Sequence, residues 1–174
     1  MADGNADADS MRAAIVAALP RLRRFCQSMA GNAADGDDLM QSTVERALQH
    51  SDQFRAGTRV DSWMFRIAQN LQIDKVRAAG RRGTAVQFDE LHDLTGDDGR
   101  AATESRNELA VIQRALGTVP DDQRAAFLLV VVEGMSYRDA SEALDVPIGT
   151  IMSRIARARA RIERALMPAE GMQQ

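Results

Sequence analysis

The sequence predicts an all-α protein made of two small helical domains joined by a flexible linker. Apolar residues recur at the three- and four-residue steps of amphipathic helices, and aromatic residues make up only 4% of the chain. A glycine-containing acidic stretch with little periodicity separates two periodic segments. We therefore expect one domain over residues 10–82, the linker over 83–104 and a second domain over 105–167.

Three helical segments are expected in the first domain. Helical spacing of apolar residues extends over 11–29, but Pro20 interrupts it, which predicts two helices or one kinked helix. Asp35 or Asp37 can cap the next helix, because a carboxylate accepts hydrogen bonds from the free amides of a helix N-terminus. The longest helix is expected over about 60–80.

The end of the second domain predicts a helix-turn-helix. A helix that opens at Pro120 precedes a short helix over Tyr137–Leu144, which Ser136 can cap. The tight connection Asp145–Gly149 follows, and then a longer helix over Thr150–Met167. This succession of short helix, tight turn and longer helix is typical of proteins that place the second helix in the DNA major groove.

The longer helix is expected to have two different faces. One is an apolar stripe that steps by three and four residues, comprising Ile148, Ile151, Ile155, Ala158 and Ile162. The opposite face is polar and comprises Ser153, Arg154, Arg157, Arg161 and Arg164. Arginine can contact guanine edges or phosphates. A helix that exposes arginine only to solvent is the alternative, but the preceding short helix and turn favour DNA binding.

Charge is distributed unevenly along the chain. The total of 22 Lys and Arg against 25 Asp and Glu gives a net charge of −3. Residues 53–82 nevertheless hold seven basic side chains against two acidic ones, and residues 154–164 hold five arginines against Glu163 alone. Two basic blocks in acidic surroundings favour local binding of a polyanion.

Other function classes receive little support. No run of ~18 apolar residues is present, and the acidic N-terminus lacks the order of a signal peptide, so we expect a cytoplasmic protein without membrane insertion. The single cysteine, Cys26, falls on an apolar face and is expected to be a buried thiol. The two histidines have no catalytic or metal-ligand spacing. We therefore expect no catalytic residues, no cofactor and no metal.

Two independent sets of motifs resemble the extracytoplasmic-function (ECF) sigma factors of bacterial RNA polymerase. DDLMQ at 37–41 and SWMFRIAQN at 62–70 resemble the family's region 2 motifs. PDDQR at 120–124, EGMSY at 133–137 and GTIMSRIARAR at 149–159 resemble its region 4. The resemblance implies a region 2 bundle and a region 4 helix-turn-helix. It also implies a non-enzymatic subunit that binds core RNA polymerase and promoter DNA and is controlled by an anti-sigma factor.

The resemblance also assigns roles in region 2. The helix that bears DDLMQ docks on the clamp helices of the polymerase in this family, although Ser42 stands where many relatives have Glu. The polymerase-binding residues implied are Asp38, Gln41, Ser42 and Glu45. At the −10 element the implied residues are Phe54 for a flipped base, Asn70 for a base edge, and Arg77, Arg81 and Arg82 for phosphates. We expect Trp63 to belong to the core. Without the resemblance, the DDLMQ segment would be read as an ordinary capped amphipathic helix.

Region 4 of the family reads the −35 element. The residues implied here are Thr150, Ser153, Arg154, Arg157 and Arg161. Met152 and Ala156 stand where many relatives have Arg and Phe, so the sequence that is recognised does not follow from the resemblance. Two alternatives are a dimeric helix-turn-helix repressor and a sigma-like mimic that sequesters an anti-sigma factor. Binding to core polymerase separates both from a sigma factor.

Overall fold

A computed structural model describes residues 3–54, 57–81 and 110–167 of the 174-residue chain. Helices account for most of these residues, and no strand occurs among them, which confirms the predicted all-α class. The linker expected over 83–104 lies outside the described residues.

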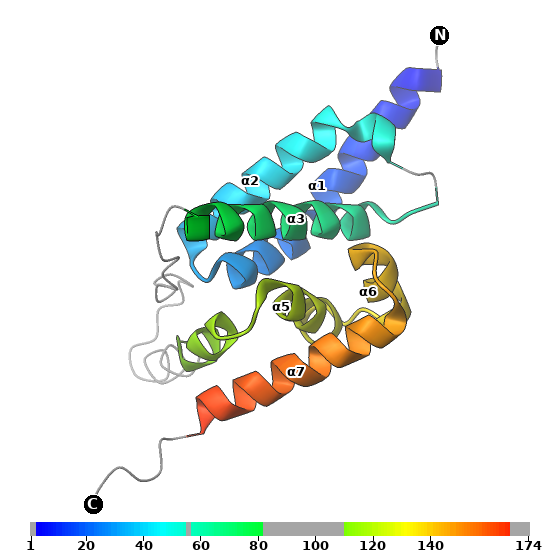
Figure 1. Cartoon of the computed structure of the whole chain (residues 1–174). Coiled ribbons are helices and arrows are strands. Elements are labelled where there is room, and N and C mark those ends of the chain that lie inside the picture. Colours follow the sequence, from blue (N-terminus) through cyan, green and yellow to red (C-terminus); the bar gives the residue numbers. More distant parts are fainter. Residues whose placement is uncertain (1–2, 55–56, 82–109, 168–174) are drawn as a thin grey trace, which may run out of the picture.

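Three helices form the first half of the molecule (Figure 1). They are α1 (Asp3–Ala30), α2 (Ala33–Gln49) and α3 (Val60–Arg81), with a short 3-10 turn, η1 (Ser51–Gln53), after α2. Each helix contacts the other two, and their apolar faces enclose a common core.

Tight packing between α1, α2 and α3 builds that core. The rings of Phe25 and Phe65 lie 5.0 Å apart between centroids, and both side chains are buried. Burying a side chain of this size stabilises the fold by ~1.5–3 kcal/mol. Gly36 lets α2 approach α1 closely, because a Cβ at this position would collide with the backbone of Gln27. Cys26 is fully buried, as predicted.

α1 passes through Pro20 without interruption, so the expected alternative of two separate helices is wrong. Proline lacks the amide that would donate to the carbonyl four residues earlier, which is that of Val16. Pro20 is exposed, and the Val16 side chain is 64% exposed, so this side of α1 faces water. Water can satisfy the freed carbonyl on an exposed helix face. The proline is tolerated for that reason.

α2 begins earlier than the sequence predicted, because its cap is Asn32. Asn32 Oδ1 accepts from the Asp35 amide at 2.7 Å, and Asn32 Nδ2 donates to Asp35 Oδ2 at 2.8 Å. Gly31 has φ 86° and ends α1, which leaves Asn32 in the extended conformation of an N-cap. The prediction of Asp35 or Asp37 as the cap was wrong.

The second half ends in a helix-turn-helix, as predicted. Residues 110–117 are helical. The elements that follow are α5 (Asp121–Phe127), the π-helical turn η2 (Leu128–Val132), α6 (Tyr137–Leu144) and α7 (Ile148–Leu166). The bounds of α6 are those predicted, and the predicted cap is present, since Ser136 Oγ accepts from the Asp139 amide at 3.0 Å.

The buried stripe of α7 is shorter than predicted. Ile151, Ile155 and Ala158 are buried and Ile162 is partly buried, but Ile148 is 45% exposed. α7 starts at Ile148, within the segment predicted to be the turn, and burial along the stripe begins only at Ile151. The inclusion of Ile148 in the stripe was therefore wrong.

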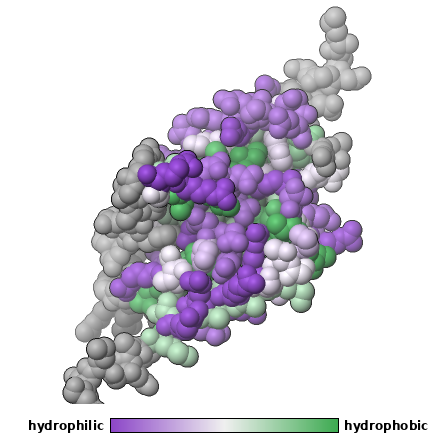
Figure 2. Space-filling view, viewed as in Figure 1, coloured by the Kyte–Doolittle hydropathy of each residue, from purple (hydrophilic) through white to green (hydrophobic). Residues whose placement is uncertain are grey.

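The two halves pack directly against each other. α3 contacts α5 and α6, and α1 contacts α5 and η2, so one continuous apolar core extends through both halves (Figure 1). Figure 2 shows that hydrophilic side chains cover most of one face, with smaller apolar areas between them.

Candidate polymerase- and DNA-binding surfaces

The four side chains predicted to bind polymerase lie together on the exposed part of α2. Asp38, Gln41, Ser42 and Glu45 are all exposed, and Gln41 Nε2 donates to Glu45 Oε1 at 3.0 Å. Their spacing of three, one and three residues places them on one side of the helix, while the other side packs into the core. The surface presents two carboxylates, an amide and a hydroxyl to a partner.

The neighbouring Asp37 holds α2 to α1. Arg23 donates from Nε and Nη2 to the two Asp37 carboxylate oxygens, each at 2.8 Å, and Gln27 Nε2 donates to Oδ1 at 3.1 Å. Hydrogen bonding to Arg23 is the main reason why the pKa of Asp37 lies below its usual value. Asp38 is thus the carboxylate of this pair that remains available to a partner.

A concave surface extends along α3 and the loop before it. The rings of Phe54 and Trp63 lie 5.3 Å apart at an angle of 57°, and both are partly buried. These two rings and the exposed side chain of Asn70 line a cavity of about 820 Å³. A second cavity of about 350 Å³ shares Trp63 and Asn70 and reaches the end of α2. Trp63 packs against the core, as expected, but it also contacts the predicted base-binding ring of Phe54.

The cations predicted to bind phosphate continue from Asn70 along α3. Arg77 and Arg81 follow Asn70 by seven and eleven residues, which places all three on one side of the helix, and all are exposed. Arg82 lies outside the described residues. From the loop before α3 to the end of that helix, the order is thus aromatic pair, amide and then guanidinium groups.

One charged residue in the middle of this surface, Arg66, had no predicted role. Arg66 lies between Trp63 and Asn70 at steps of three and four residues, which is the spacing that could have identified it. Arg66 and Arg59 line the larger cavity, and the opposite wall carries acidic side chains of the second half of the molecule: Asp139, Glu142 and Asp145.

The predicted −35 residues all lie on α7, but their surroundings differ. Ser153 Oγ donates to the carbonyl of Thr150 at 3.0 Å, and both residues are partly buried. Arg154 Nε lies 3.2 Å from Asp122 Oδ2, and its side chain is 18% exposed. Arg157 is exposed, and Arg161 is exposed with a long 3.5 Å hydrogen bond to a backbone carbonyl. The exposed arginines are therefore Arg157 and Arg161, while Asp122 positions Arg154.

A fully buried arginine, Arg124, connects the helix-turn-helix half to the end of α1. Arg124 is 2% exposed, and its Nη2 donates to the carbonyl of Met29 at the end of α1 at 2.8 Å. It also bonds to Asp121 and to the carbonyls of Leu116 and Val119. Burial lowers the pKa of Arg124 and raises that of Asp121. Arg124 thus joins the first helix of the chain to the helix-turn-helix half.

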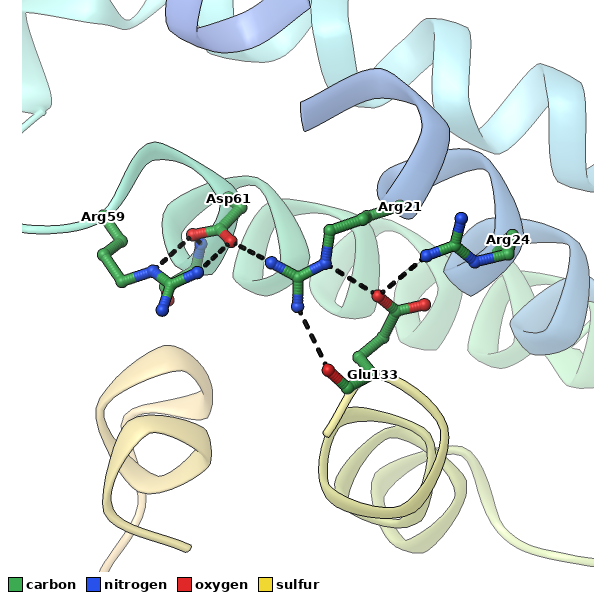
Figure 3. Close-up of polar contacts among 6 residues, drawn as sticks. Arg21, Arg24, Arg59, Asp61 and Glu133 are labelled. Atoms are coloured by element: carbon green, nitrogen blue, oxygen red, sulfur yellow. Dashed lines mark hydrogen bonds and ion pairs between the residues drawn. The ribbon is translucent and has the colours of Figure 1, made fainter. Parts of the chain in front are cut away.

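A polar cluster between the halves centres on Arg21 (Figure 3). Arg21 Nη1 donates to Asp61 Oδ2 at 2.5 Å, and its Nε donates to Glu133 Oε2 at 2.8 Å. Arg24 also reaches Glu133 Oε2, at 3.3 Å, and Arg59 pairs with Asp61 at 2.7 Å. Burial opposes ionisation of Asp61, but the hydrogen bonds and charge of Arg59 and Arg21 prevail and lower its pKa.

The chain is similar to a family of known proteins in both of its halves. The Sigma-70 region 2 family matches residues 15–82, and the Sigma-70 region 4 family matches residues 109–162. The chain is 37% identical to the ECF RNA polymerase sigma factor EcfG of Rhodopseudomonas palustris over 94% of this chain and 88% of that protein. The chain belongs to the ECF sigma factors. It is thus a sigma factor, the subunit through which RNA polymerase recognises promoter DNA and initiates transcription.

Two solved structures share the fold of this sigma factor. The first is the sigma factor RpoE of Bartonella quintana in complex with the anti-sigma factor NepR, with 29% identity, a TM-score of 0.73, and coverage of 90% of this chain and 96% of that one. The second is the anti-anti-sigma factor PhyR of the same organism complexed with NepR, with 18% identity, a TM-score of 0.61, and coverage of 89% and 50%. The second likeness concerns the fold alone.

No helix in the part of the sigma factor that the structure describes is long and apolar enough to cross a membrane.

Proposed function

We propose that the concave surface of α3 captures the separated −10 strand of the promoter. Single-stranded DNA binding combines base stacking on aromatic groups with a basic track for the backbone. The Phe54–Trp63 pair supplies the stacking surface, Asn70 offers donors and acceptors to a base edge, and Arg77, Arg81 and Arg82 bind phosphates. The placement of the aromatic pair and Asn70 on one cavity is the observation that carries this proposal.

α7 reads the −35 element in this proposal. Arg157 reaches base edges from the exposed face, and Arg161 binds phosphate farther along the helix. Thr150 and Ser153 lie near the start of α7, where free amides favour a phosphate. Arg154 reaches the groove in an orientation that its pair with Asp122 restricts. A restricted arginine loses less conformational entropy when it binds a base.

The exposed face of α2 docks on the polymerase. Asp38, Gln41, Ser42 and Glu45 form this contact, and the pair of Arg23 with Asp37 holds α2 in place behind it. The region 2 unit over residues 10–82 and the region 4 unit over 105–167 act as the two DNA-binding modules, with 83–104 as the connection. The chain acts as a non-enzymatic, cytoplasmic subunit without a cofactor.

An anti-sigma factor controls this sigma factor in our proposal. The support is its likeness to RpoE of Bartonella quintana, which was solved in complex with the anti-sigma factor NepR. A mimic that only sequesters an anti-sigma factor would share the fold, as the likeness to PhyR illustrates. The exposed Arg77, Arg81 and Arg157 favour a DNA-binding role, because a mimic has no need of them.

Reconstitution with core RNA polymerase tests the proposed function. We expect a stable complex with core, transcripts from duplex promoters only when the chain is added, and weak binding of the free chain to duplex DNA, in the range of ~10⁻⁴–10⁻⁶ M. No binding to core would favour a mimic. Tight and sequence-specific binding of duplex DNA by the isolated chain would favour a repressor.

A further inference from the structure

The exposed side of α7 carries apolar side chains as well as arginines. Met152 is 58% exposed and Ile148 is 45% exposed, although both are large and apolar. They lie one helical turn apart, and the exposed Ala156 follows Met152 at the same step of four residues. These three residues, which we call the apolar ridge, therefore form a continuous apolar line outside the core.

Packing of α7 on the core does not account for the apolar ridge. Ile151, Ile155 and Ala158 of the same helix are buried, so α7 already has a stripe that attaches it to the core. Single exposed apolar residues are common on protein surfaces, but adjoining ones indicate a binding surface. The apolar ridge is therefore available to a partner.

Ser153 separates the apolar ridge from the arginines. Met152 and Arg154 directly precede and follow Ser153, and a helix turns by about 100° per residue, so these two side chains lie on opposite sides of it. Ala156 lies on the Met152 side, and Arg157 lies on the Arg154 side. α7 thus has an apolar flank and a cationic flank along the surface proposed to face the −35 element.

DNA is the partner that the surroundings of the apolar ridge favour. Residues 154–164 hold five arginines against Glu163 alone, and this positive charge attracts a polyanion. Arg157 and Arg161, which are proposed to bind DNA, are exposed on the same helix. An apolar ridge that adjoins this cationic surface enters the major groove together with it.

The two flanks of α7 match different base edges of the major groove. Guanine presents two acceptors, N7 and O6, to a guanidinium group, whereas thymine presents a C5-methyl group that packs against apolar side chains. Residues near the N-terminus of a recognition helix meet the base edges, and Met152 is the fifth residue of α7. Its unbranched thioether chain adapts to the position of a methyl group.

We propose that Met152 determines −35 specificity by packing against the C5-methyl group of a thymine, beside the base that Arg157 contacts. Ile148 and Ala156 extend the apolar surface one turn before and one turn after it. This inference rests on the proposed role of α7 in −35 recognition, and it adds the kind of base that the apolar flank selects.

Removal of a single methyl group from the promoter tests this contact. Holoenzyme reconstituted from core polymerase and the parent chain first selects promoters from a library with randomised −35 positions. The thymines of the selected A·T pairs are then replaced one at a time by deoxyuridine, which lacks only the C5-methyl group and pairs with adenine in the same way. Electrophoretic shifts compare the binding of holoenzyme to the thymine and deoxyuridine duplexes.

Substitutions in the chain separate methyl contact from other roles of Met152. Met152→Ala removes most of the side chain, Met152→Gln keeps its length but makes its end polar, and Met152→Leu keeps its apolar volume. Met167→Ala is the matched control, because Met167 is 70% exposed at the other end of α7. Arg157→Ala is measured in parallel as a change in the cationic flank.

For the parent chain, deoxyuridine at one −35 position should weaken binding about fourfold, which is the effect of losing one buried methyl group. Met152→Ala and Met152→Gln should weaken binding to the thymine promoter by a similar factor and should bind both promoters equally. Met152→Leu and Met167→Ala should retain the preference of the parent chain. Arg157→Ala should weaken binding to both promoters and also retain the preference, because it affects a different base.

Equal binding of the parent chain to thymine and deoxyuridine promoters would overturn the inference. A deoxyuridine effect that persists unchanged in Met152→Ala, or a selected −35 element without any A·T pair, would overturn it as well. If Arg157→Ala still relaxed −35 selection in these cases, the proposed function of α7 would stand and only the role of Met152 would fall. A parent holoenzyme that selects no −35 sequence at all would instead refute the proposed function of α7.

Discussion

The two proposed DNA-binding surfaces differ in how available they are. On α7, Arg157 and Arg161 are exposed and the helix faces outward, whereas the α3 cavity lies against the acidic side of α6. The helix-turn-helix therefore exposes the arginines of α7 to solvent, while its α6 helix lines one side of the α3 cavity. Under the proposed assignment, the −35 surface is exposed to solvent, whereas the −10 surface shares its cavity with the carboxylates of Asp139, Glu142 and Asp145.

The largest expected effect is the loss of stability when the helix that carries the −35 surface, α7, is detached from the core. Ile151→Ala deletes a fully buried side chain that attaches α7 to the core, and such truncations cost ~2–5 kcal/mol. Chemical denaturation followed by circular dichroism measures the loss. Met152→Ala is the control, because the adjacent Met152 is 58% exposed, and it should change stability by less than ~0.5 kcal/mol. Equal losses in both variants would mean that α7 is not packed as described.

The dependence of folding stability on pH tests the burial of Cys26 in the core of the first half. Burial raises the pKa of this thiol to about 12, and an unfolded cysteine has a pKa of ~8.5. The folded form therefore binds the proton more tightly, and its stability advantage is complete below pH ~8.5 and lost as pH rises toward 12. We expect the stability of the parent chain to fall by about 2 kcal/mol more than that of Cys26→Ala between pH 8 and 10. Parallel pH profiles would contradict burial of the thiol.

Arg157→Ala should weaken DNA binding through the exposed surface of α7 and leave binding through α3 unchanged. The loss of a bidentate base contact should cost ~1–3 kcal/mol and map to the −35 element. The helix should remain folded, because its buried stripe is untouched. Arg164→Ala, farther along the same exposed side, is the control and should have a smaller effect. Electrophoretic shifts of holoenzyme on promoters with altered −35 sequences provide the measurement, and a loss without dependence on −35 sequence would remove Arg157 from base recognition.

Asn70→Ala should have the smallest effect on promoter binding, and that effect should come from the α3 cavity. One lost hydrogen bond corresponds to ~0.5–1.5 kcal/mol. Because the proposed partner is an unpaired base, the defect should appear in open-complex formation on duplex templates. A template with a pre-melted −10 bubble should relieve it. Equal defects on duplex and bubble templates would place Asn70 outside strand capture.

Local features of the helix-turn-helix were predictable from the sequence. The bounds of α6 and its Ser136 cap agree with the prediction, because capping and apolar spacing act within a few residues. The exposed polar residues of α2 and α3 were identified through the resemblance to the family's motifs, and the structure places them on the surface. At the start of α7 the same reasoning failed, since Pro147 caps the helix and Ile148 is its first residue.

Features that depend on contacts between distant segments were not predictable. The role of Arg66 depends on the end of α6, 76 residues away, and the restricted position of Arg154 depends on Asp122. Pro20 lies within α1 because its side of the helix faces water, which spacing alone did not decide. The contact between the halves also escaped prediction, because the residues that form it each have a plausible local role.

Transcription of a promoter library with randomised −35 and −10 positions tests the central claim most directly. Core polymerase is supplied with the parent chain, Arg157→Ala or Asn70→Ala, and the transcribed promoters are sequenced. The parent should select two separate sequence blocks, Arg157→Ala should relax only the upstream block, and Asn70→Ala should relax only the downstream block. Relaxation of the same block by both variants would contradict the assignment of α7 and α3 to different promoter elements.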